Sequence, residues 1–310
     1  MNLIDFESII SLTLEEKNEE VFSLLENFSV LNGRNKEGKT LLGAAAEKGS
    51  LSLVRKIVEK GADLNFRSLE YKETPLMIAA QEGKLEIVKF LISKGAVIHG
   101  ALTRAAHKEI IDLLLDSGAD IDEKDLDAGD TPLIMAAYGG HLEIINYLLE
   151  KGAGIDIKNE NSEITAICAA GAKGNIPIVQ ELINRGANLH GLLSQAAYFG
   201  YPEIVKLALE NGADVNERDK ENLVPLIHAT SRKGNGENLE ILKILFDYDV
   251  DIDLEAPATG YEASVGFAAI FQAIHYDEYE IEKFLLEKGV EIVMRVDNRD
   301  VYYKRVEQKN

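Results

Sequence analysis

The sequence predicts an all-α solenoid of stacked helix-turn-helix units joined by loops or β-hairpins. Three observations predict it. The segment ETPLMIAAQEGKLEIVKFLISKGA at 73–96 has a near copy, DTPLIMAAYGGHLEIINYLLEKGA, at 130–153. A glycine closes each copy, and the apolar residues of its second half recur at i, i+3, i+4 and i+7, the spacing of one helix face. One copy has too few apolar contacts to fold alone, so the units must stack.

Further copies lie on both sides, at 39–65 and 164–190, with weaker ones starting at Val224 and Ala268. The closing glycines are Gly61, Gly95, Gly118, Gly152, Gly186, Gly212 and Gly289, and Asp249 takes this place in the seventh unit. We therefore predict one elongated domain of about seven to eight repeats over residues 35–294. Residues 1–34 are expected to form an N-terminal helical cap, and residues 295–310 a C-terminal cap or a frayed tail.

Each position of the unit has a physical reason. Thr74 can cap a helix N-terminus, and Pro75 suits the first helical position because its missing N–H would be unpaired there. The pair Ala79-Ala80 lets neighbouring helices pack closely, and Gly83 allows a tight turn into the second helix. The closing glycine fits a left-handed C-cap.

The resulting pattern, G-x-T-P-L-x-x-A-A-x-x-G-x-L-E-I-V-x-x-L-L-x-x-G-A-D-V-N, resembles the ankyrin repeat, and the resemblance covers about residues 18–290. It implies a helix, a turn, a second helix, and then a loop or β-hairpin finger at about a right angle. It also implies that fingers and first helices line a concave face that binds other proteins.

Two units depart from this pattern. Those ending at Gly118 and Gly212 pass straight from His-Gly into the first helix, with no room for a finger. We therefore predict two compact repeats, with gaps in the row of fingers at Gly100 and Gly191. Longer connections are expected at Lys233–Asn238 and Leu254–Val265.

The most acidic stretch, Asp120 to Asp130, falls in a finger. It does not fit a calcium loop of the EF-hand type, because a frame starting at Asp120 has Asp125 sixth, and one starting at Asp125 meets Gly129 a residue early. We expect no metal site there. The stretch is predicted to be a solvated acidic finger, and whether it also faces a partner stays open. In the partner-facing interpretation the contacts are Asp125, Asp127, Asp130 and Glu163.

The sequence shows no reactive site. Its six histidines are spread over different repeats without metal-ligand spacing, and Cys168 lies in a small apolar segment with no base placed beside it. Walker, G-x-G-x-x-G and G-x-S-x-G motifs are absent from the sequence. We expect no enzyme activity and no cofactor.

A variable stripe is the better signal for binding. The two residues before each mid-repeat glycine are variable in ankyrin-like repeats and point to the concave face. Here they are Glu47-Lys48, Gln81-Glu82, Tyr138-Gly139, Ala172-Lys173, Tyr198-Phe199, Ser231-Arg232 and His275-Tyr276. Aromatic residues are typical interface anchors. We therefore predict partner contacts at Tyr138, Tyr198, Phe199, Tyr201 and Tyr276, against the alternative that the aromatic residues fill the space of a missing finger.

Charge and composition narrow the partner. The net charge of −20 disfavours nucleic acid and favours a protein with a basic patch, although acidic surfaces also serve solubility. No apolar run approaches the ~20 residues that cross a bilayer. The N-terminus carries Asp5 and Glu7 where a secretory signal has Lys or Arg, so a cytoplasmic location is expected. The chain is also expected to be a monomer. Delivery into a host cell by an intracellular bacterium is a further possibility.

We predict a non-enzymatic protein-binding module whose concave face grips a basic partner, acting as a scaffold or adaptor. Two alternatives stay open. The protein could be an inhibitor or immunity-type protein whose carboxylates block a basic active site such as that of a nuclease. It could also be a secreted bacterial effector that acts as an adaptor for host proteins.

Overall fold

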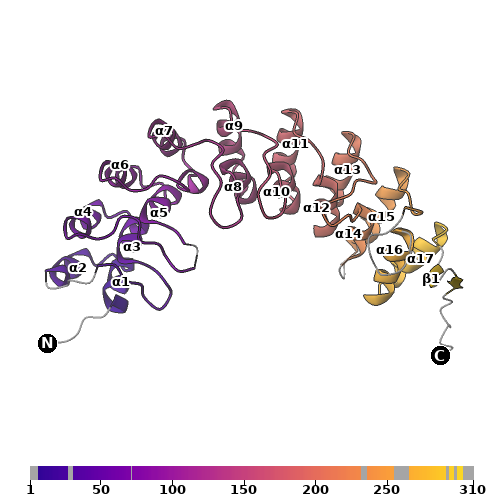
Figure 1. Cartoon of the computed structure of the whole chain (residues 1–310), viewed down its shortest axis with the longest axis horizontal. Helices are drawn as coiled ribbons and strands as arrows, with labels where there is room; N and C mark the ends of the chain where they lie inside the picture. The colour runs from indigo at the N-terminus through magenta and orange to yellow at the C-terminus, as the bar shows by residue number, and fades with distance from the viewer. Residues whose placement is uncertain are drawn as a thin grey trace. The chain divides into compact units, whose positions relative to one another are not determined.

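The computed structural model describes residues 6–26, 31–70, 72–231, 236–254, 265–290, 293–296 and 299–302. The chain divides into two compact units, Met1–Ser162 and Glu163–Asn310. Within both units short helices stack in pairs (Figure 1). The single domain expected over residues 35–294 stays a prediction.

In the first unit the helices form two stacked rows. The first helices of the pairs are α1 (Phe6–Leu14), α3 (Leu41–Lys48), α5 (Pro75–Gln81), the 3-10 helix η1 (Leu102–Arg104) and α8 (Pro132–Gly139). The second helices are α2 (Asn18–Leu25), α4 (Leu51–Glu59), α6 (Leu85–Ser93), α7 (Lys108–Asp116) and α9 (Leu142–Glu150). Loops extend away from the rows before α3, α5 and α8 (Figure 1).

The second unit repeats this plan. Its first helices are α10 (Ala166–Ala172), α12 (Leu192–Phe199), α14 (Pro225–Thr230) and α16 (Val265–His275). Its second helices are α11 (Ile176–Asn184), α13 (Pro202–Glu210), α15 (Glu237–Asp247) and α17 (Tyr279–Glu287). Strands β1 (Val293–Val296) and β2 (Arg299–Tyr302) form an antiparallel hairpin after the last helix, with Val296 opposite Arg299.

The predicted cap and packing residues act as expected. The hydroxyl of Thr74 accepts the Met77 N–H at 3.2 Å, and that of Thr131 accepts the Ile134 N–H at 3.3 Å. Ala79 and Ala80 are fully buried, as small residues between closely packed helices should be. The stacked helix pairs of the sequence prediction are therefore confirmed.

Adjacent repeats are also joined by side chains that lie at the end of a repeat. Carboxamide or carboxylate oxygens there accept a backbone N–H of the next repeat. The pairs are Asn32 with Asp63, Asn65 with Val97, Asp122 with Gly154 and Asn216 with Asp251, at 2.8, 2.8, 2.9 and 2.8 Å. These bonds fix the spacing of one repeat on the next.

One element differs from the sequence prediction. The compact repeat at Gly100 was expected to begin with a full helix, but it has only the 3-10 turn η1. The reason is length, because the segment 101–107 before α7 is three residues shorter than the segment 192–201 before α13. The compact repeat at Gly191 does begin with a helix, α12. The longer connections predicted after Ser231 and after Leu254 lie largely outside the described residues.

Candidate functional site

Each finger loop within the described residues is closed by one polar side chain at the same place in the repeat. In the acidic finger this side chain belongs to Asp125. Its Oδ1 accepts the N–H groups of Asp127, Ala128, Gly129 and Asp130 at 3.1, 2.9, 2.9 and 3.3 Å. Asn35, Ser68, Asn159 and Asp219 accept backbone N–H groups in the other loops. Asp125, predicted as a partner contact, thus has a loop-forming role of its own.

The other acidic residues predicted as contacts differ in exposure. Asp130 is only 7% exposed, and the side chain of Asn159 donates to its Oδ1 at 2.8 Å. Burial raises the pKa of the Asp130 carboxyl. Asp127 is exposed and lies 3.3 Å from the ammonium group of Lys72. Glu163, in the second unit, is exposed as well. Asp127 and Glu163 are therefore the carboxylates of this set that a partner can reach.

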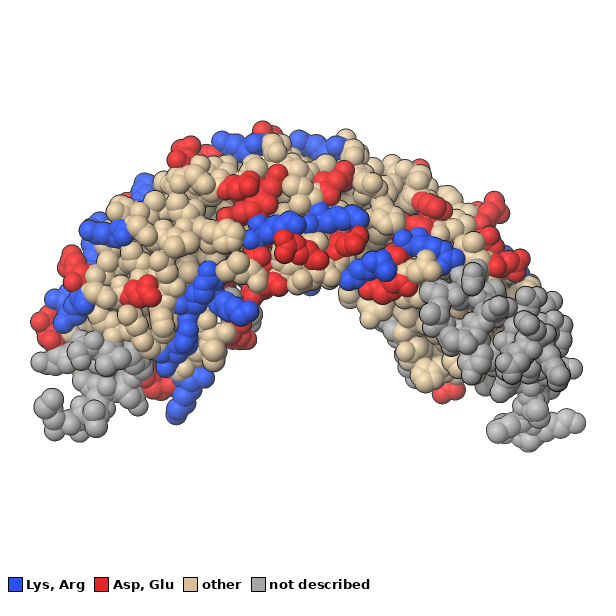
Figure 2. Space-filling view, viewed as in Figure 1, with Lys and Arg blue, Asp and Glu red and all other residues tan. Residues whose placement is uncertain are grey.

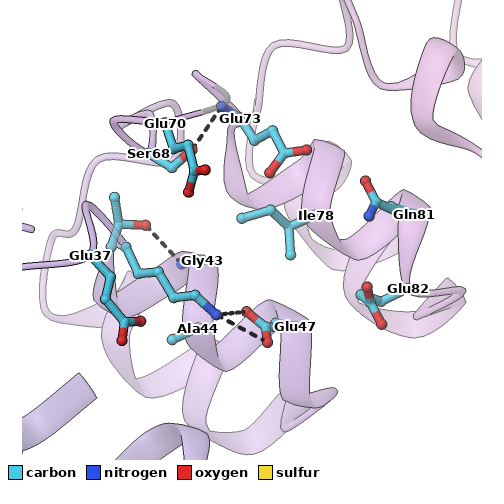
Figure 3. Close-up of a pocket in the computed structure, with 12 residues that line it drawn as sticks. Glu37, Gly43, Ala44, Glu47, Ser68, Glu70, Glu73, Ile78, Gln81 and Glu82 are labelled. Carbon is cyan, nitrogen blue, oxygen red and sulfur yellow. Dashed lines mark hydrogen bonds and ion pairs between the residues drawn. The ribbon is translucent and has the colours of Figure 1, made fainter. Parts of the chain in front are cut away.

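A cavity of about 390 Å³ opens between the first two finger loops. Its walls come from the loops before α3 and α5 and its base from those helices (Figure 3). We call it the acidic hollow, and its main lining side chains are Glu37, Glu47, Glu70, Glu73, Glu82 and Ile78. Three residues of the predicted stripe, Glu47, Gln81 and Glu82, line it.

Negative charge in the acidic hollow is only partly neutralised. Glu47 pairs with the ammonium group of Lys39 at 3.0 Å, and Glu73 lies 3.8 Å from the guanidinium of Arg104. Burial raises the pKa of Glu73 despite Arg104, and nearby carboxylates add to the shift. The other glutamates of the hollow have no ion pair within the described part of the chain.

Two predicted aromatic contacts lie together in the second unit. Tyr198 and Phe199, at the end of α12, are 40% and 42% exposed, and their rings meet edge to face at 5.0 Å. The Tyr198 ring also meets the imidazole of His228, on α14, at 6.0 Å. We call Tyr198, Phe199 and His228 the aromatic patch. Since this compact repeat has no finger of its own, its Tyr198 and Phe199 rings stay open to solvent.

The remaining predicted aromatic contacts are less accessible. Tyr201 is half-buried over the preceding turn, where its Cε1 lies 2.5 Å from the position that a Cβ of Gly174 would take. Tyr276 is half-buried and meets His275 edge to face at 4.9 Å. Tyr138 is half-buried on α8 of the first unit. Tyr201 thus fills space beside the turn of the preceding repeat, and its role as a partner contact stays a prediction.

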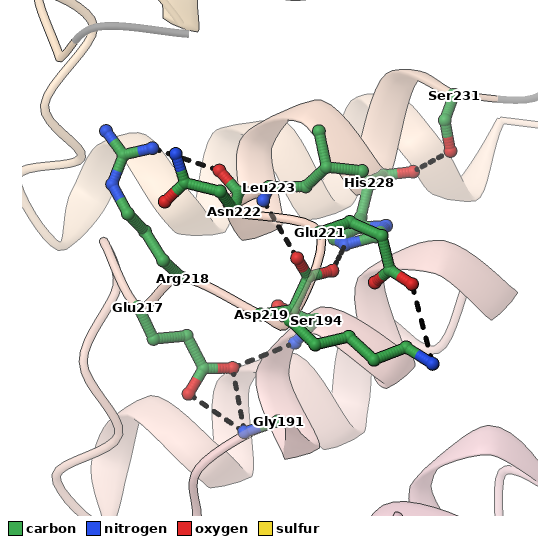
Figure 4. A network of polar contacts seen from close by, with 11 residues as sticks. Gly191, Ser194, Glu217, Arg218, Asp219, Glu221, Asn222, Leu223, His228 and Ser231 are labelled. Carbon is green, nitrogen blue, oxygen red and sulfur yellow. Dashed lines mark hydrogen bonds and ion pairs between the residues drawn. The ribbon is translucent and has the colours of Figure 1, made fainter. Parts of the chain in front are cut away.

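A hydrogen bond ties the finger of the second unit to α14 beside the aromatic patch. The Asp219 carboxylate accepts the Leu223 N–H at 2.8 Å with Oδ1, and its Oδ2 lies 2.6 Å from His228 Nε2 (Figure 4). One carboxylate therefore closes the finger turn and also positions the imidazole that contacts Tyr198.

Two buried glutamates, Glu123 and Glu217, were not predicted from the sequence as functional residues. Glu217 accepts the N–H groups of Gly191 at 3.0 Å and Ser194 at 3.3 Å, at the start of α12 (Figure 4). Glu123 accepts those of Gly100 and Leu102, both at 3.1 Å, at the start of η1. Each glutamate also lies 3.4 Å from a histidine, His190 or His99. Burial raises the pKa of both carboxyls.

A signal for these glutamates was present in the sequence. Both lie two residues before the side chain that closes a finger, where other fingers have Phe66 and Ile157. The glutamates occur at this place in the fingers that follow a compact repeat. Because a compact repeat has no Thr-Pro start, the cap for its first helix comes from the next repeat.

Cys168 is buried in the second unit. It accepts a hydrogen bond from the Thr165 hydroxyl at 3.2 Å, and its thiol donates to the His190 carbonyl at 3.4 Å. Among the residues that the structure describes, no group of three or more His, Cys, Asp or Glu side chains could hold a metal ion. None of the helices in the same residues has the length and apolar character needed to cross a bilayer.

The charged surface is mixed in sign. On the face shown in Figure 2, Lys and Arg side chains lie among Asp and Glu side chains. Ion pairs account for part of this mixing, such as Lys108 with Glu143 at 2.7 Å and Lys151 with Asp112 at 2.6 Å. Opposite charges therefore lie side by side on this face, whereas the lining of the acidic hollow has five glutamates and one lysine.

Comparison with protein families gives a match over most of the chain. A family model described as ankyrin repeats in three copies matches residues 10–101, 98–191 and 193–296. A search of curated proteins finds no match to the sequence.

Proposed function

Because the chain belongs to the ankyrin repeat family, whose repeats are generally protein-protein interaction modules, we propose that it binds a basic protein through the aromatic patch of the second unit and catalyses no reaction. The observation that carries this proposal is the exposed pair Tyr198 and Phe199. Two neighbouring rings of this size on a soluble surface are typical of an interface anchor.

The surroundings of the patch favour a partner with Lys or Arg side chains. The faces of aromatic rings attract cations, and Asp219 lies beside the patch through its bond to His228. The net charge of −20 draws a basic protein toward the chain at low salt. Asp127 and Glu163 are further exposed carboxylates on their own units, and we propose that they add to this attraction.

The patch is also built on rigid elements. Tyr198 and Phe199 belong to α12, whose first turn is fixed by the buried carboxylate of Glu217. His228 is held by Asp219, which is in turn part of the finger loop. Anchors that are already ordered lose less conformational entropy on binding, so a surface of this kind can bind tightly with few contacts.

The experiment is selection of binders from a displayed library of natural and random peptides, with the full chain as bait. We expect enrichment of sequences rich in Lys and Arg. The affinity of the enriched peptides should fall by about 30-fold or more with Tyr198→Ala/Phe199→Ala, as for interface anchors. The control is Tyr279→Ala, which removes a 63% exposed ring from another helix of the same unit and should leave affinity unchanged.

Peptides that bind the double variant and the Tyr279 variant as well as they bind the unchanged chain would contradict the proposal. Enrichment of acidic or neutral peptides would contradict the basic partner. The natural proteins that contain the enriched sequences then show whether the chain acts as an inhibitor or as an adaptor. A single tightly bound basic enzyme favours an inhibitor, whereas several weaker partners favour an adaptor.

A further inference from the structure

We propose that the acidic hollow of the first unit is a docking site for one arginine side chain of a protein partner. This inference rests on the proposed function, since it assumes a protein partner, but it concerns a different surface. The aromatic patch belongs to the second unit, and the hollow is formed wholly within the first.

The size of the hollow suits a side chain. Its volume of about 390 Å³ lies near the lower end of the range for ligand pockets, roughly 300–1,000 Å³. It opens between two finger loops, at the place where the repeat pattern implies a binding face. A space of this size can accept one long side chain with a few water molecules, and it is too small for a folded element.

Part of the base of the hollow is apolar. Ile78 points into the space from α5, and Ala44 of α3 lies beside it (Figure 3). Aliphatic stems of Arg and Lys cover apolar surface in this way while the charged group stays among polar groups. At the position equivalent to Ile78, the first helices of the second unit carry the small Ala169 in α10 and the polar Gln195, His228 and Gln272 in α12, α14 and α16. None of these four helices therefore has a large aliphatic side chain at this position.

The walls supply complementary charge from several directions. Glu70 and Glu73 come from one finger loop, Glu37 from the other, and Glu82 from the end of α5. Glu37, Glu70 and Glu82 are exposed and have no ion pair within the described residues, so their oxygens are available. The pKa of Glu73 is raised because its buried negative charge is poorly solvated. A cation bound in the hollow would lower the energetic cost of burying this charge.

The arrangement favours a guanidinium over other cations. The five N–H donors of a guanidinium point in several directions within one plane, so they can reach carboxylates on different walls. An ammonium group is a compact point charge, and Lys39 already places one beside Glu47. A bare metal ion needs its ligands close together, and the described carboxylates form no such group.

The test follows the Ile78 δ1 methyl resonance of the full chain by NMR, assigned with Ile78→Val. The probes are N-acetyl-arginine amide, N-acetyl-lysine amide and N-acetyl-citrulline amide, the last being a neutral relative of arginine. We expect the arginine amide to shift the methyl resonance in a saturable way, the lysine amide to bind more weakly, and the citrulline amide to have no effect.

Substitutions test whether the arginine amide binds in the acidic hollow. Glu70→Gln/Glu73→Gln should weaken binding of the arginine amide by about threefold or more, because both partly exposed carboxylates lose their charge. Glu59→Gln/Glu150→Gln makes the same charge change on second helices of the same unit and should leave binding unchanged. Glu70→Gln alone changes an exposed side chain, so its weaker binding cannot arise from unfolding.

Three results would overturn the proposal. They are equal shifts with arginine and citrulline amides, equal affinity for lysine and arginine amides, and equal affinity of the hollow and control variants. The aromatic patch separates this failure from failure of the proposed function. If the hollow fails while selected peptides still depend on Tyr198 and Phe199, the protein-binding function stands without this site.

Discussion

The compact repeat at Gly100 and the compact repeat at Gly191 lack a finger at the same place, yet they keep different amounts of helix. The first has η1 and the second has α12. Their starts are nevertheless built alike. Gly100 and Gly191 have φ of +82° and +84°, and a Cβ placed on them would lie 2.2 Å from Cε of the buried Met77 and 3.1 Å from Sγ of the buried Cys168.

The start of a compact repeat therefore depends on the buried glutamate and not on the length of the helix that follows. Glu123 caps a single 3-10 turn and Glu217 caps a helix of eight residues, with almost the same bond lengths. Losing the finger removes the threonine that normally caps the first helix. The following repeat then supplies the missing acceptor across the junction, whatever the first helix becomes.

The largest expected effect comes from removing this acceptor. Glu217→Ala leaves the N–H groups of Gly191 and Ser194 buried without a partner, and Glu123→Ala does the same at Gly100 and Leu102. We expect each change to lower the free energy of unfolding by about 2–4 kcal/mol, measured by urea unfolding. Glu217→Gln and Glu123→Gln keep an oxygen acceptor and should retain most or all of the stability. A Gln variant as unstable as its Ala counterpart would refute the capping role.

A smaller effect should come from the turns that precede the compact repeats. Gly83 and Gly174 have φ of +68° and +69°, and His107 and Tyr201 lie where a Cβ would be placed. Gly174→Ala should lower the free energy of unfolding by about 2 kcal/mol, from backbone strain of about 1–2 kcal/mol and overlap with the Tyr201 ring.

The matched control is Gly186→Ala, which has φ of +81° and nothing within 4 Å of the new Cβ. It should show the backbone strain alone. Adding Tyr201→Ala to Gly174→Ala should remove the overlap, so that the two changes together are less destabilising than the sum of the separate changes. Strict additivity, measured by urea unfolding, would show that Tyr201 does not pack on this turn.

The smallest effect concerns pH. Burial raises the pKa of Glu217 in the folded state, so folding disfavours the charged form. This destabilisation is fully present above the folded-state pKa, and it disappears as pH falls through that pKa toward the value of the unfolded chain. The stability of Glu217→Gln relative to that of the unchanged chain should therefore be highest near pH ~7 and fall on acidification. Urea unfolding at several pH values in a His190→Asn background separates this effect from titration of the neighbouring imidazole.

Much of the fold was predictable because it depends on local chemistry. Thr74 and Pro75 mark the start of a helix, Gly95 marks an end, and the apolar spacing of 85–92 marks the face that packs. These preferences act within a few residues, and the repeat shows each of them several times. The 3-10 turn η1 was missed because the Ala-Ala pair of that repeat resembles a helix, whereas the short segment before α7 leaves no space for one.

The candidate site was less predictable, because it depends on contacts between repeats. Asp125 and Asp127 look alike in an acidic run, but Asp125 closes the finger while Asp127 remains exposed. Similarly, Tyr198 and Tyr201 are near neighbours in sequence, yet Tyr201 covers the turn of the preceding repeat. The sequence around Ile78 did not indicate a cavity, because Ile78 lines one only through the way the two finger loops are placed above it.

The borrowed caps limit how this array can change in length. Deleting or duplicating one repeat of a solenoid keeps a helix cap intact where the repeat brings its own capping threonine, as those that begin with α3, α5 and α8 do. A repeat that begins at Gly100 or Gly191 instead depends on the next repeat for its helix cap, so the two repeats must be kept together. Any engineered shortening that ends after Gly118 or after Gly212 would separate such a pair and expose an uncapped helix end, whereas a boundary after Gly95 or Gly186 would keep it whole.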